Sequence, residues 1–506
     1  MKKNFLLTVI AFLFISSSFQ GQTIHRLTLD KCVELAGEQS FQMRKSKSAY
    51  EIAKYQYLIQ ISRLNTSISF NFNPDFDQRY NPDLDFKNSN GENLHKSNRS
   101  FSTSSYFSIN QPLPTGGDIY FSPGFSTNKA YYFSRTTEND ISELEVKGIS
   151  FSPSLRLVQP LNVLYAYNDY IHIQEKAELN FESADLSYRQ IIFLNQFNIG
   201  NIYFNLQNIL KNIETQKMLL SIKQKVYNTA SVNSKKDSSE LLKLEIEIER
   251  TKTKLNNYYH SYTGISKDLK EQLALPVQDS LILTKEMQTD EYLFNSDQLI
   301  RIASERHLLI KKYNIEIKLD ELKYKEIESQ ILPQIDLTLR FNPYASVTGS
   351  GDLSYLDLTA DSWYQSKRRI ETLNDLSVGL SIGIPIYDGK RTRNSLNITD
   401  EEIRINKINI EEQEQLIQKN IHTLVEQIAY TLENIKIIET TMESSQQNME
   451  DGIQKFYNEE TDTYRLAYDL KLWEDAQLNY SAMQTNYNLL INRLEYEILD
   501  HLENVQ

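Results

Sequence analysis

The sequence predicts an α+β membrane protein, in which amphipathic strands contribute to a transmembrane β-barrel and long helices continue outside the membrane. Three observations lead to this prediction. Several short segments alternate strictly between apolar and polar residues, as strands with one apolar face do. Much longer segments have helical periodicity but are too polar to cross a bilayer. The order of these segments also occurs twice along the chain, which indicates an internal duplication.

The composition argues against several classes of protein. A formal net charge of −13 over 506 residues disfavours binding to nucleic acid or to an anionic membrane surface. Only 15 glycines and 11 prolines are present, which favours long regular elements over many short loops. Beyond the N-terminal stretch, no segment approaches about 18 uninterrupted apolar residues, so transmembrane helices are not expected.

Residues 1–21 are predicted to be a secretory signal peptide. Lys2 and Lys3 form its basic end, residues 5–15 its apolar core and residues 16–21 its small, polar cleavage region. The apolar core is too short to span a bilayer. The single cysteine, Cys32, has no disulfide partner and lies on the apolar face of a predicted helix, so we expect it in the core.

The clearest strand is predicted over residues 376–384, where serine and glycine alternate with branched apolar residues. Pro385 removes a ladder donor and ends the strand, and Asp388 with Gly389 supplies the turn before a long helix. One apolar and one small polar face suit a wall between lipid and a wet interior. A strand of a soluble sandwich can have the same pattern. How often the pattern recurs along the chain distinguishes the two kinds of strand.

The first repeat is predicted over residues 22–295. Polar segments 74–99 and 127–147 are expected to be loops, 111–117 a turn and 277–295 a mixed connector, and Gln159 with Pro160 closes the last strand. Its strands are expected at 66–74, 101–110, 118–126 and 149–158, and its helices at 28–64, 164–229 and 239–275.

The second repeat is predicted over residues 296–506 and aligns with the first without a gap at an offset of 267 residues. Asp30, Ala36 and Tyr57, for example, recur as Asp297, Ala303 and Tyr324. A polar loop is expected over 342–375. The strands are expected at 335–341 and 376–384, and the helices at 296–332, 391–449 and 461–502.

These few strands cannot close a barrel within one chain. An open sheet edge in lipid leaves backbone groups without partners, so several chains must share one barrel. Helices of about 60 residues reach roughly 90 Å. The combination fits a tube that stands on a membrane and extends far beyond it.

The chain resembles the TolC-type outer-membrane efflux proteins, also called outer membrane factors, over nearly all of its mature length. The resemblance rests on the paired helices LTLDKCVELA and SDQLIRIASE, the strand LPQIDLTL and the junctions LRLVQPLNV and LSIGIPIYDGKR. It implies a homotrimer whose β-barrel lies in the outer membrane and continues into a helical tunnel in the periplasm. The implied function is the passive channel of a tripartite efflux pump or type I secretion system, with a periplasmic adaptor (membrane fusion) protein and an inner-membrane RND or ABC transporter as partners.

The first repeat departs from the family pattern of two membrane strands per repeat and twelve per trimer, because it has four alternating segments. Either the barrel grows to eighteen strands, or the extra hairpin, which lies within residues 101–158, packs against the barrel or in its mouth. Pro123 and Pro153 are unfavourable within central strands. The good alternation of both segments nevertheless favours an enlarged barrel.

The resemblance also implies an acidic periplasmic entrance. The candidates are Glu459, Glu460, Asp462 and Asp469, at and beyond the turn between the predicted helices 391–449 and 461–502. Three copies of these acids would favour cations. They can equally be ordinary solvated turn and helix residues. The turn between the predicted helices 164–229 and 239–275 is a candidate adaptor contact. It contains Ser234, Lys235, Lys236 and Asp237.

The sequence shows no catalytic, cofactor or metal site. Its seven histidines are scattered, without an HExxH pattern or a second ligand nearby, and there is no phosphate-binding loop. Two other readings stay open at this stage: an exported coiled-coil structural or adhesin-like protein without channel activity, and an exported hydrolase.

Overall fold

The computed structural model describes residues 23–87, 93–137, 140–162, 167–232, 238–284, 287–292, 294–350, 354–372, 375–458 and 460–500. The predicted signal peptide, residues 1–21, lies outside them. The chain divides into two compact units. One comprises Met1–Glu51, Ser183–Tyr313 and Ile408–Gln506, and the other Ile52–Glu182 and Asn314–Lys407.

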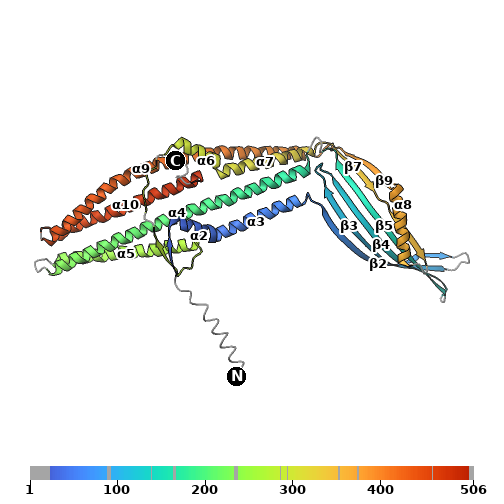
Figure 1. The fold of residues 1–506 in the computed structure, drawn as a ribbon, viewed down its shortest axis with the longest axis horizontal. Helices are drawn as coiled ribbons and strands as arrows, with labels where there is room; N and C mark the ends of the chain where they lie inside the picture. Colours follow the sequence, from blue (N-terminus) through green and yellow to red (C-terminus); the bar gives the residue numbers. More distant parts are fainter. Residues whose placement is uncertain are drawn as a thin grey trace, which may run out of the picture. The chain divides into compact units, whose positions relative to one another are not determined.

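The second unit contains one antiparallel sheet. Its strands are β2 (Ser67–Lys87), β3 (Asn93–Pro112), β4 (Asp118–Thr137), β5 (Asp140–Pro160), β7 (Gln334–Phe341) and β9 (Leu376–Gly383), in that spatial order. A short strand, β8 (Ala345–Ser350), pairs with the upper part of β5 beyond the end of β7. Within the described residues the sheet is open, with β2 and β9 at its edges (Figure 1).

Two predicted loops are strands, so this part of the sequence analysis was wrong. Of their residues, 74–87, 93–99, 127–137 and 140–147 continue the ladders of β2 to β5. Hydroxyl groups bridge neighbouring strands there: Thr103 and Thr127 lie 2.6 Å apart between their Oγ1 atoms. Because both faces of these upper strands carry polar residues, the alternation that identifies a strand is absent from the sequence.

The predicted loop over 342–375 is also wrong, since it contains β8 and the helix α8 (Tyr355–Thr372). Leu358, Ser362 and Ser366 lie four residues apart on α8 and are buried. The hydroxyl groups of Ser362 and Ser366 donate to the backbone carbonyls of Ala345 and Pro343. Polar side chains therefore attach this helix to the strand connection. Because two of its buried residues are serines, the sequence has no apolar stripe there that would predict a helix.

The two prolines of the extra hairpin lie where the ladder does not need their missing N–H groups. Pro123 of β4 is directly opposite Pro153 of β5. The pairing of β3 with β4 stops at Tyr106–Gly124 and resumes at Ile109–Phe121, so Pro123 lies in the gap. Pro153 lies between the segments of β5 that pair with β8 and with β7. Both strands thus tolerate proline.

Each predicted strand-entry helix is two helices. The segment 28–64 forms α2 (Leu29–Gln39) and α3 (Phe41–Ser62), and the segment 296–332 forms α6 (Ser296–Arg306) and α7 (Leu308–Ser329). Ser40 and His307 leave the helical conformation, with ψ angles of 144° and 118°. These two breaks are separated by the same 267 residues as the repeats. No glycine or proline signals them.

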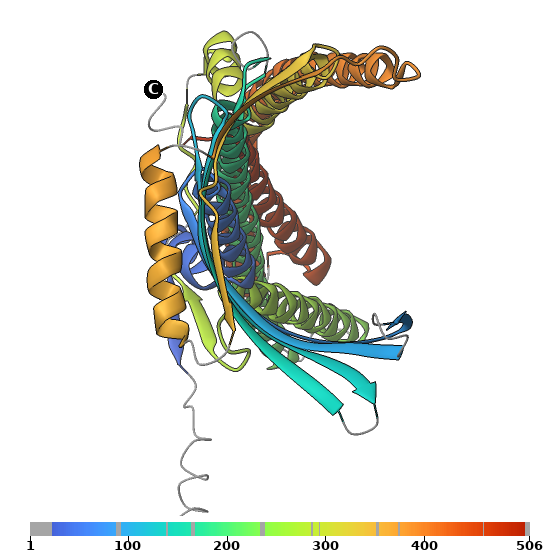
Figure 2. The same ribbon diagram turned by 90° about the vertical axis from the view of Figure 1, so that its right-hand side faces the viewer.

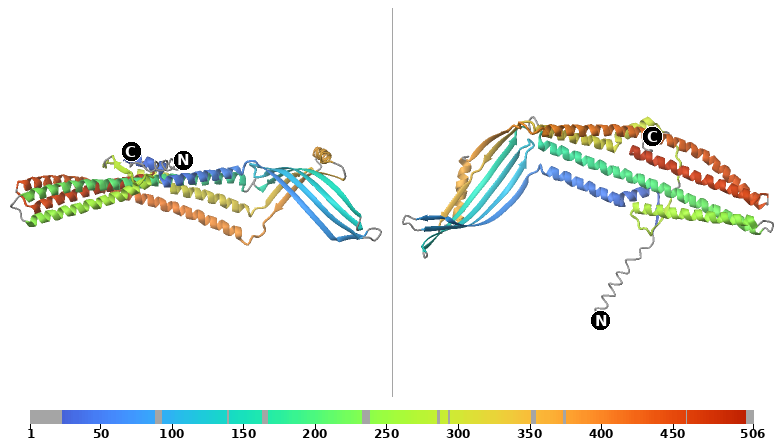
Figure 3. Two further views of the ribbon diagram at one scale, coloured as in Figure 1. Left: turned by 90° about the horizontal axis from the view of Figure 1, so that it is seen from below. Right: turned by 180° about the vertical axis from the view of Figure 1, so that it is seen from behind.

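Four longer helices complete the chain: α4 (Asp169–Val232), α5 (Ser238–Gln272), α9 (Arg391–Tyr457) and α10 (Thr463–Ile498). α9 continues past the predicted end at residue 449, because Gly452 packs against Asp469 of α10 instead of ending the helix. Figure 3 shows α4 and α9 as the longest helical ribbons. No helix in the described part of the chain is long and apolar enough to cross a membrane.

The first unit has three apolar cores along these helices. One joins Cys32 and Ala36 to Ile199, Tyr203 and Leu269, which confirms the prediction for Cys32. A two-stranded parallel sheet borders this core and pairs β1 (Ile24–Leu27) with β6 (Ser280–Leu283), which lies in the mixed connector predicted over residues 277–295. His25 and Asp279 bond across it at 2.9 Å, which lowers the pKa of the Asp279 carboxyl.

Candidate membrane interface and entrance

The sheet presents a continuous apolar row on one face. The row crosses all six strands in register, and Phe121, Leu155 and Leu376 remain 41%, 44% and 54% exposed. A water-soluble domain rarely leaves so large an apolar patch uncovered. The six residues, from β2 to β9, are Ile68, Ile109, Phe121, Leu155, Phe341 and Leu376.

The next residues along the strands form a row of polar and charged side chains on the opposite face. Arg156 lies over the ring of Tyr120, with 5.8 Å between the guanidinium carbon and the ring centroid. Small residues dominate the same face further up, where Ser126 and Ser150 bond to each other at 2.5 Å. The polar row, from β2 to β9, is Ser67, Asn110, Tyr120, Arg156, Arg340 and Ser377.

The apolar face ends at a charged band. Lys129 of β4 lies 3.0 Å from Glu145 of β5, and Lys147 lies 3.4 Å from the same carboxylate. These residues share the face of Leu155, because all of them are odd-numbered positions of unbroken ladders. Between Leu157 and Ile149, β5 spans about 26 Å at roughly 3.3 Å per residue. About 9–11 tilted residues are needed for a strand to span a membrane, so the apolar band has a suitable height.

α8 lies on the apolar face. The ring of Trp363 packs edge-on against Phe151 of β5, with 5.3 Å between their centroids, and Phe151 pairs with Phe125 in the apolar rows. Figure 2 shows α8 on the convex side of the curved sheet. The apolar face is therefore the convex one, and the polar face lines the concave side. Convex apolar and concave polar is the arrangement of a membrane barrel wall.

The predicted strand-to-helix junctions are built from specific hydrogen bonds. Gln159 binds the turn between β3 and β4: Thr115 Oγ1 donates to Gln159 Oε1 at 2.6 Å, and Gln159 Nε2 donates to the Thr115 carbonyl at 2.8 Å. Pro160, the last residue of β5, lies opposite Asp336. This clamp joins the extra hairpin to the end of the sheet.

The junction after β9 is a helix cap. Pro385 follows the end of the strand, and the Asp388 carboxylate accepts hydrogen bonds from the backbone N–H groups of Lys390 at 2.9 Å and Thr392 at 2.7 Å. The Thr392 hydroxyl also donates to it, and these bonds lower the pKa of the Asp388 carboxyl. Gly389 has φ +71°, the left-handed conformation that favours glycine.

The candidate entrance residues have different surroundings. Asp462 caps α10, since its carboxylate accepts from the Arg465 N–H at 2.8 Å. Asp469 is 6% exposed and lies 3.7 Å from the Arg465 Nε atom. Glu460 is exposed and donates its own N–H to the Lys455 carbonyl. Arg465 thus contacts Asp462 through its backbone N–H and Asp469 through its side chain, while Glu459 lies outside the described residues.

The candidate adaptor contact lies beyond what the structure describes. Ser234, Lys235, Lys236 and Asp237 belong to the segment 233–237, which joins α4 to α5 outside the described ranges.

A buried polar cluster was missed by the sequence analysis. Glu474 of α10 is 4% exposed and accepts hydrogen bonds from Gln216 of α4 at 2.8 Å and Lys254 of α5 at 2.5 Å. Lys223 similarly reaches Glu247 at 3.2 Å and Thr251 at 3.1 Å. In the sequence, Thr251 is the one interruption among the apolar and aromatic residues that recur every three or four positions from Leu241 to Leu269, and it is the only sequence signal of these contacts.

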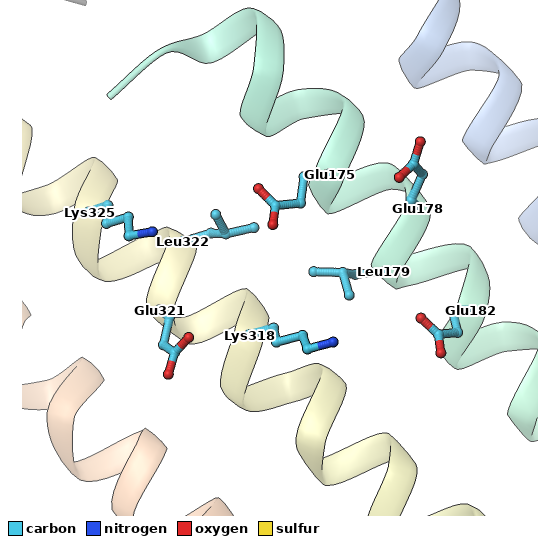
Figure 4. Close-up of a pocket in the computed structure, with 8 residues that line it drawn as sticks. All are labelled: Glu175, Glu178, Leu179, Glu182, Lys318, Glu321, Leu322 and Lys325. Atoms are coloured by element: carbon cyan, nitrogen blue, oxygen red, sulfur yellow. The ribbon is translucent and has the colours of Figure 1, made fainter. Parts of the chain in front are cut away.

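A charged cavity of about 380 Å³ lies between α4 and α7 in the second unit. Figure 4 shows Glu175 pointing toward α7, whereas Glu178 points away from it. Among the described residues no cluster of three or more His, Cys, Asp or Glu is arranged to hold a metal ion. The lining residues are Glu175, Glu178, Leu179, Glu182, Lys318, Glu321, Leu322 and Lys325.

Comparisons by sequence find nothing: no family model and no curated protein matches the chain. Solved structures do match. The outer membrane protein VceC from Vibrio cholerae is 11% identical with a TM-score of 0.63, covering 94% of this chain and 96% of its own. The open MtrE outer membrane channel from Neisseria gonorrhoeae is 11% identical with a TM-score of 0.64, covering 94% and 89%. The Campylobacter jejuni CmeC outer membrane channel is 13% identical with a TM-score of 0.62, covering 95% and 90%. Identities this low demonstrate a shared fold, and the resemblance noted in the sequence is confirmed at that level: this chain has the TolC-type fold of the outer membrane factor channels.

Proposed function

We propose that this protein is the outer-membrane channel of an export system. Three copies share one β-barrel in the outer membrane, and their helices extend into the periplasm as a tunnel. The channel is a passive duct without catalytic activity. Transport is energised by an inner-membrane RND or ABC transporter, to which a periplasmic adaptor protein connects the tunnel.

The observation that supports this proposal best is the two-faced sheet joined directly to long polar helices. Its apolar row is exposed on the convex side, as a lipid-facing surface is, and its polar row faces the concave side. The solved structures of the same fold are described as outer membrane channels. A fold alone does not assign a function, but here the distribution of side chains on the sheet agrees with it.

The open edges support an assembly of several copies. β2 and β9 each expose one row of backbone N–H and C=O groups along the described sheet. Such groups are costly in hydrocarbon unless they are paired. Pairing β9 of one copy with the lower part of β2 of the next closes the ring at the level of the ladder between β7 and β9.

The entrance and adaptor contact remain proposals. Glu459, Glu460 and Asp462, at the tip before α10, would form an acidic ring in three copies and favour cations. The 233–237 tip carries Lys235 and Lys236 and is the proposed adaptor contact. Asp469 is the weakest member of the entrance set, because its carboxylate packs against Gly452.

The alternative is an exported coiled-coil structural or adhesin-like protein without channel activity. It accounts for the packed helices but leaves the exposed apolar row of the sheet unused. The experiment that separates the two is fractionation of the cell envelope, followed by sizing of the detergent-extracted protein. Recovery in the outer membrane as a trimer supports the channel, whereas a water-soluble monomer or dimer would overturn it.

A further inference from the structure

The extra hairpin is part of the wall. Besides the short β8, the second repeat contributes two strands to the sheet, β7 and β9, whereas the first contributes four. β3 and β4 lie between β2 and β5 in one uninterrupted antiparallel order, and they share both the apolar and the polar row. Neither strand folds over a face of the sheet.

We propose that three copies close a barrel of eighteen strands, which makes the pore about one and a half times as wide as a twelve-stranded one. This inference rests on the proposed function, since it requires the trimer. Six strands per chain is an even number, so β9 of one copy runs antiparallel to β2 of the next. Ile68 and Phe70 lie on the apolar face of β2, and Leu376 and Val378 lie on the apolar face of β9, so the apolar faces of the two edge strands match across the junction.

The helices attached to the sheet support the larger ring. Their order is α3, α4, α7, α9, the order of the strands that they adjoin. Neighbours in this order contact one another within the second unit: Tyr57 stacks on Phe181, Lys176 lies 2.5 Å from Glu326, and Lys323 lies 2.6 Å from Glu402. The four helices therefore form one layer.

The width of this helical layer is close to the width of the six-stranded sheet. Four helices packed about 9 Å apart cover roughly 36 Å of circumference. Six strands about 4.8 Å apart, tilted by about 40°, cover roughly 38 Å, whereas four strands cover only about 25 Å. The extra hairpin thus gives the strand ring and the helix ring nearly equal circumferences, and no constriction is needed where they join.

The wider lumen also changes the class of solute that can pass through the barrel. Barrels of about 16–18 strands enclose an aqueous channel, whereas about 8 strands leave an interior filled by side chains. The polar face carries small residues such as Ser122, Ser154 and Gly379, whose short side chains leave space in the lumen for solvent. The barrel therefore has room for bulky hydrated solutes, which pass the larger Tyr120, Arg156 and Arg340 side chains of the same face.

The test uses one new cysteine in the purified full-length trimer. Cys32 is fully buried, and burial raises the pKa of its thiol to about 12, so it does not react. Ser69→Cys places a thiol on the polar face of β2, and maleimide polymers of graded diameter are added to the detergent-solubilised trimer. The same substitution is made in a variant that lacks residues 93–137, which removes β3 and β4 and leaves four strands. Phe70→Cys, on the apolar face, is the control for general access.

We expect the largest polymer that labels Ser69→Cys to be about one and a half times wider in the full chain than in the shortened variant. Equal cut-offs would overturn the inference. Electron microscopy of the full-length trimer provides a second measurement that does not depend on folding of the variant: eighteen strands in the barrel section support the proposal and twelve refute it. Measuring the size of the protein before labelling distinguishes failure of this inference from failure of the proposed function, because a protein that is not a trimer contradicts the proposed function itself.

Discussion

Gln159 and Thr115 exchange two hydrogen bonds across the lower end of the sheet, one from the threonine hydroxyl and one from the glutamine amide. The pair connects the last residues of β5 to the turn that joins β3 and β4. Gly117 lies against it, since a Cβ atom there would be 2.6 Å from Gln159 Oε1. The extra hairpin is thereby tied to the junction from which α4 starts.

Gln159→Ala should lower the free energy of unfolding by about 1–2 kcal/mol, because two partly exposed hydrogen bonds are lost. Thermal unfolding in detergent, followed by circular dichroism, measures this effect. A double-mutant cycle with Thr115→Val isolates the hydroxyl bond: strict additivity of the two substitutions would show that this bond contributes nothing.

The Asp388 cap predicts a pH dependence. Hydrogen bonds from Thr392 and Lys390 stabilise the charged carboxylate and lower its pKa below the unfolded value. A lowered pKa contributes stability that is fully present above the unfolded pKa of about 3.9 and is lost as the pH falls through the folded pKa. Asp388→Asn should therefore lower the Tm at neutral pH, and its difference from the unchanged protein should shrink in acid.

Thr392→Val is the matched variant for this cap. It keeps the carboxylate but removes the hydroxyl donor, so the folded pKa is lowered less and the loss of stability in acid should be smaller, and complete at a higher pH, than in the unchanged protein. A difference between Asp388→Asn and the unchanged protein that stays constant down to acid pH would refute the role of the charged form.

Gly200 of α4 tests close helix packing. A Cβ atom at this position would lie 2.5 Å from the Asn492 side chain, whose amide donates to the Phe197 carbonyl at 2.9 Å. Gly200→Ala should cost about 1–3 kcal/mol of stability, because Asn492 must move and lose its bonds. Adding Asn492→Ala should recover part of this loss.

Gly264 of α5 is the control, since nothing lies within 4 Å of a Cβ built there. Gly264→Ala should raise stability by up to about 1 kcal/mol through helix propensity alone. Chemical denaturation of both variants gives the comparison, and a stabilising Gly200→Ala would show that the helices separate easily at this level.

The buried Glu474 predicts unequal effects for two lysines. Lys254→Met removes the cation 2.5 Å from a carboxylate that is 4% exposed, and should cost about 1–3 kcal/mol. Lys471→Met breaks an exposed pair with Asp475 at 3.3 Å and should change stability by less than about 0.5 kcal/mol. Urea denaturation midpoints measure both, and equal effects would contradict the importance of burial here.

The proposed lipid contact is tested on adjacent residues of β5. Leu155 lies in the apolar row and Ser154 on the opposite face. Leu155→Arg should weaken insertion by about 2–4 kcal/mol, as for arginine near the middle of a lipid-facing barrel surface, whereas Ser154→Arg should be tolerated. The readout is the amount of trimer recovered from outer membranes. If both variants insert equally well, the convex face is not the lipid-facing one.

The sequence was sufficient where one face of an element is apolar and the other is not. The alternation of Leu376, Val378 and Leu380 predicted β9, and Pro385 its end. It failed in the upper strands, because Lys129 and Lys147 on one face and Asn128 and Gly148 on the other are all polar or small. Hydrogen bonding between neighbouring strands forms those ladders, and it leaves no periodic pattern to read.

The candidate site was less predictable, because its surroundings are set by residues far away in the chain. Asp462 was recognised as an acid near a tip, but the structure shows a helix cap. Asp469 owes its burial to Gly452 on another helix, and Glu474 meets Gln216 and Lys254 from two more. Spacing along one segment cannot predict which acid of α10 faces a neighbour and which faces solvent.

The sheet is six strands wide only in its lower part. The ladder of β7 and β9 ends at the pair Phe341–Leu376, whereas β2 to β5 continue well beyond this level, accompanied by the short β8 and by α8. In the proposed orientation the part of these strands beyond the charged band of Lys129, Glu145 and Lys147 faces the cell's surroundings. Insertions, deletions and substitutions there leave the lower ladder unchanged, so the part of the protein that phages and antibodies would meet can diversify under selection while the pore keeps its dimensions.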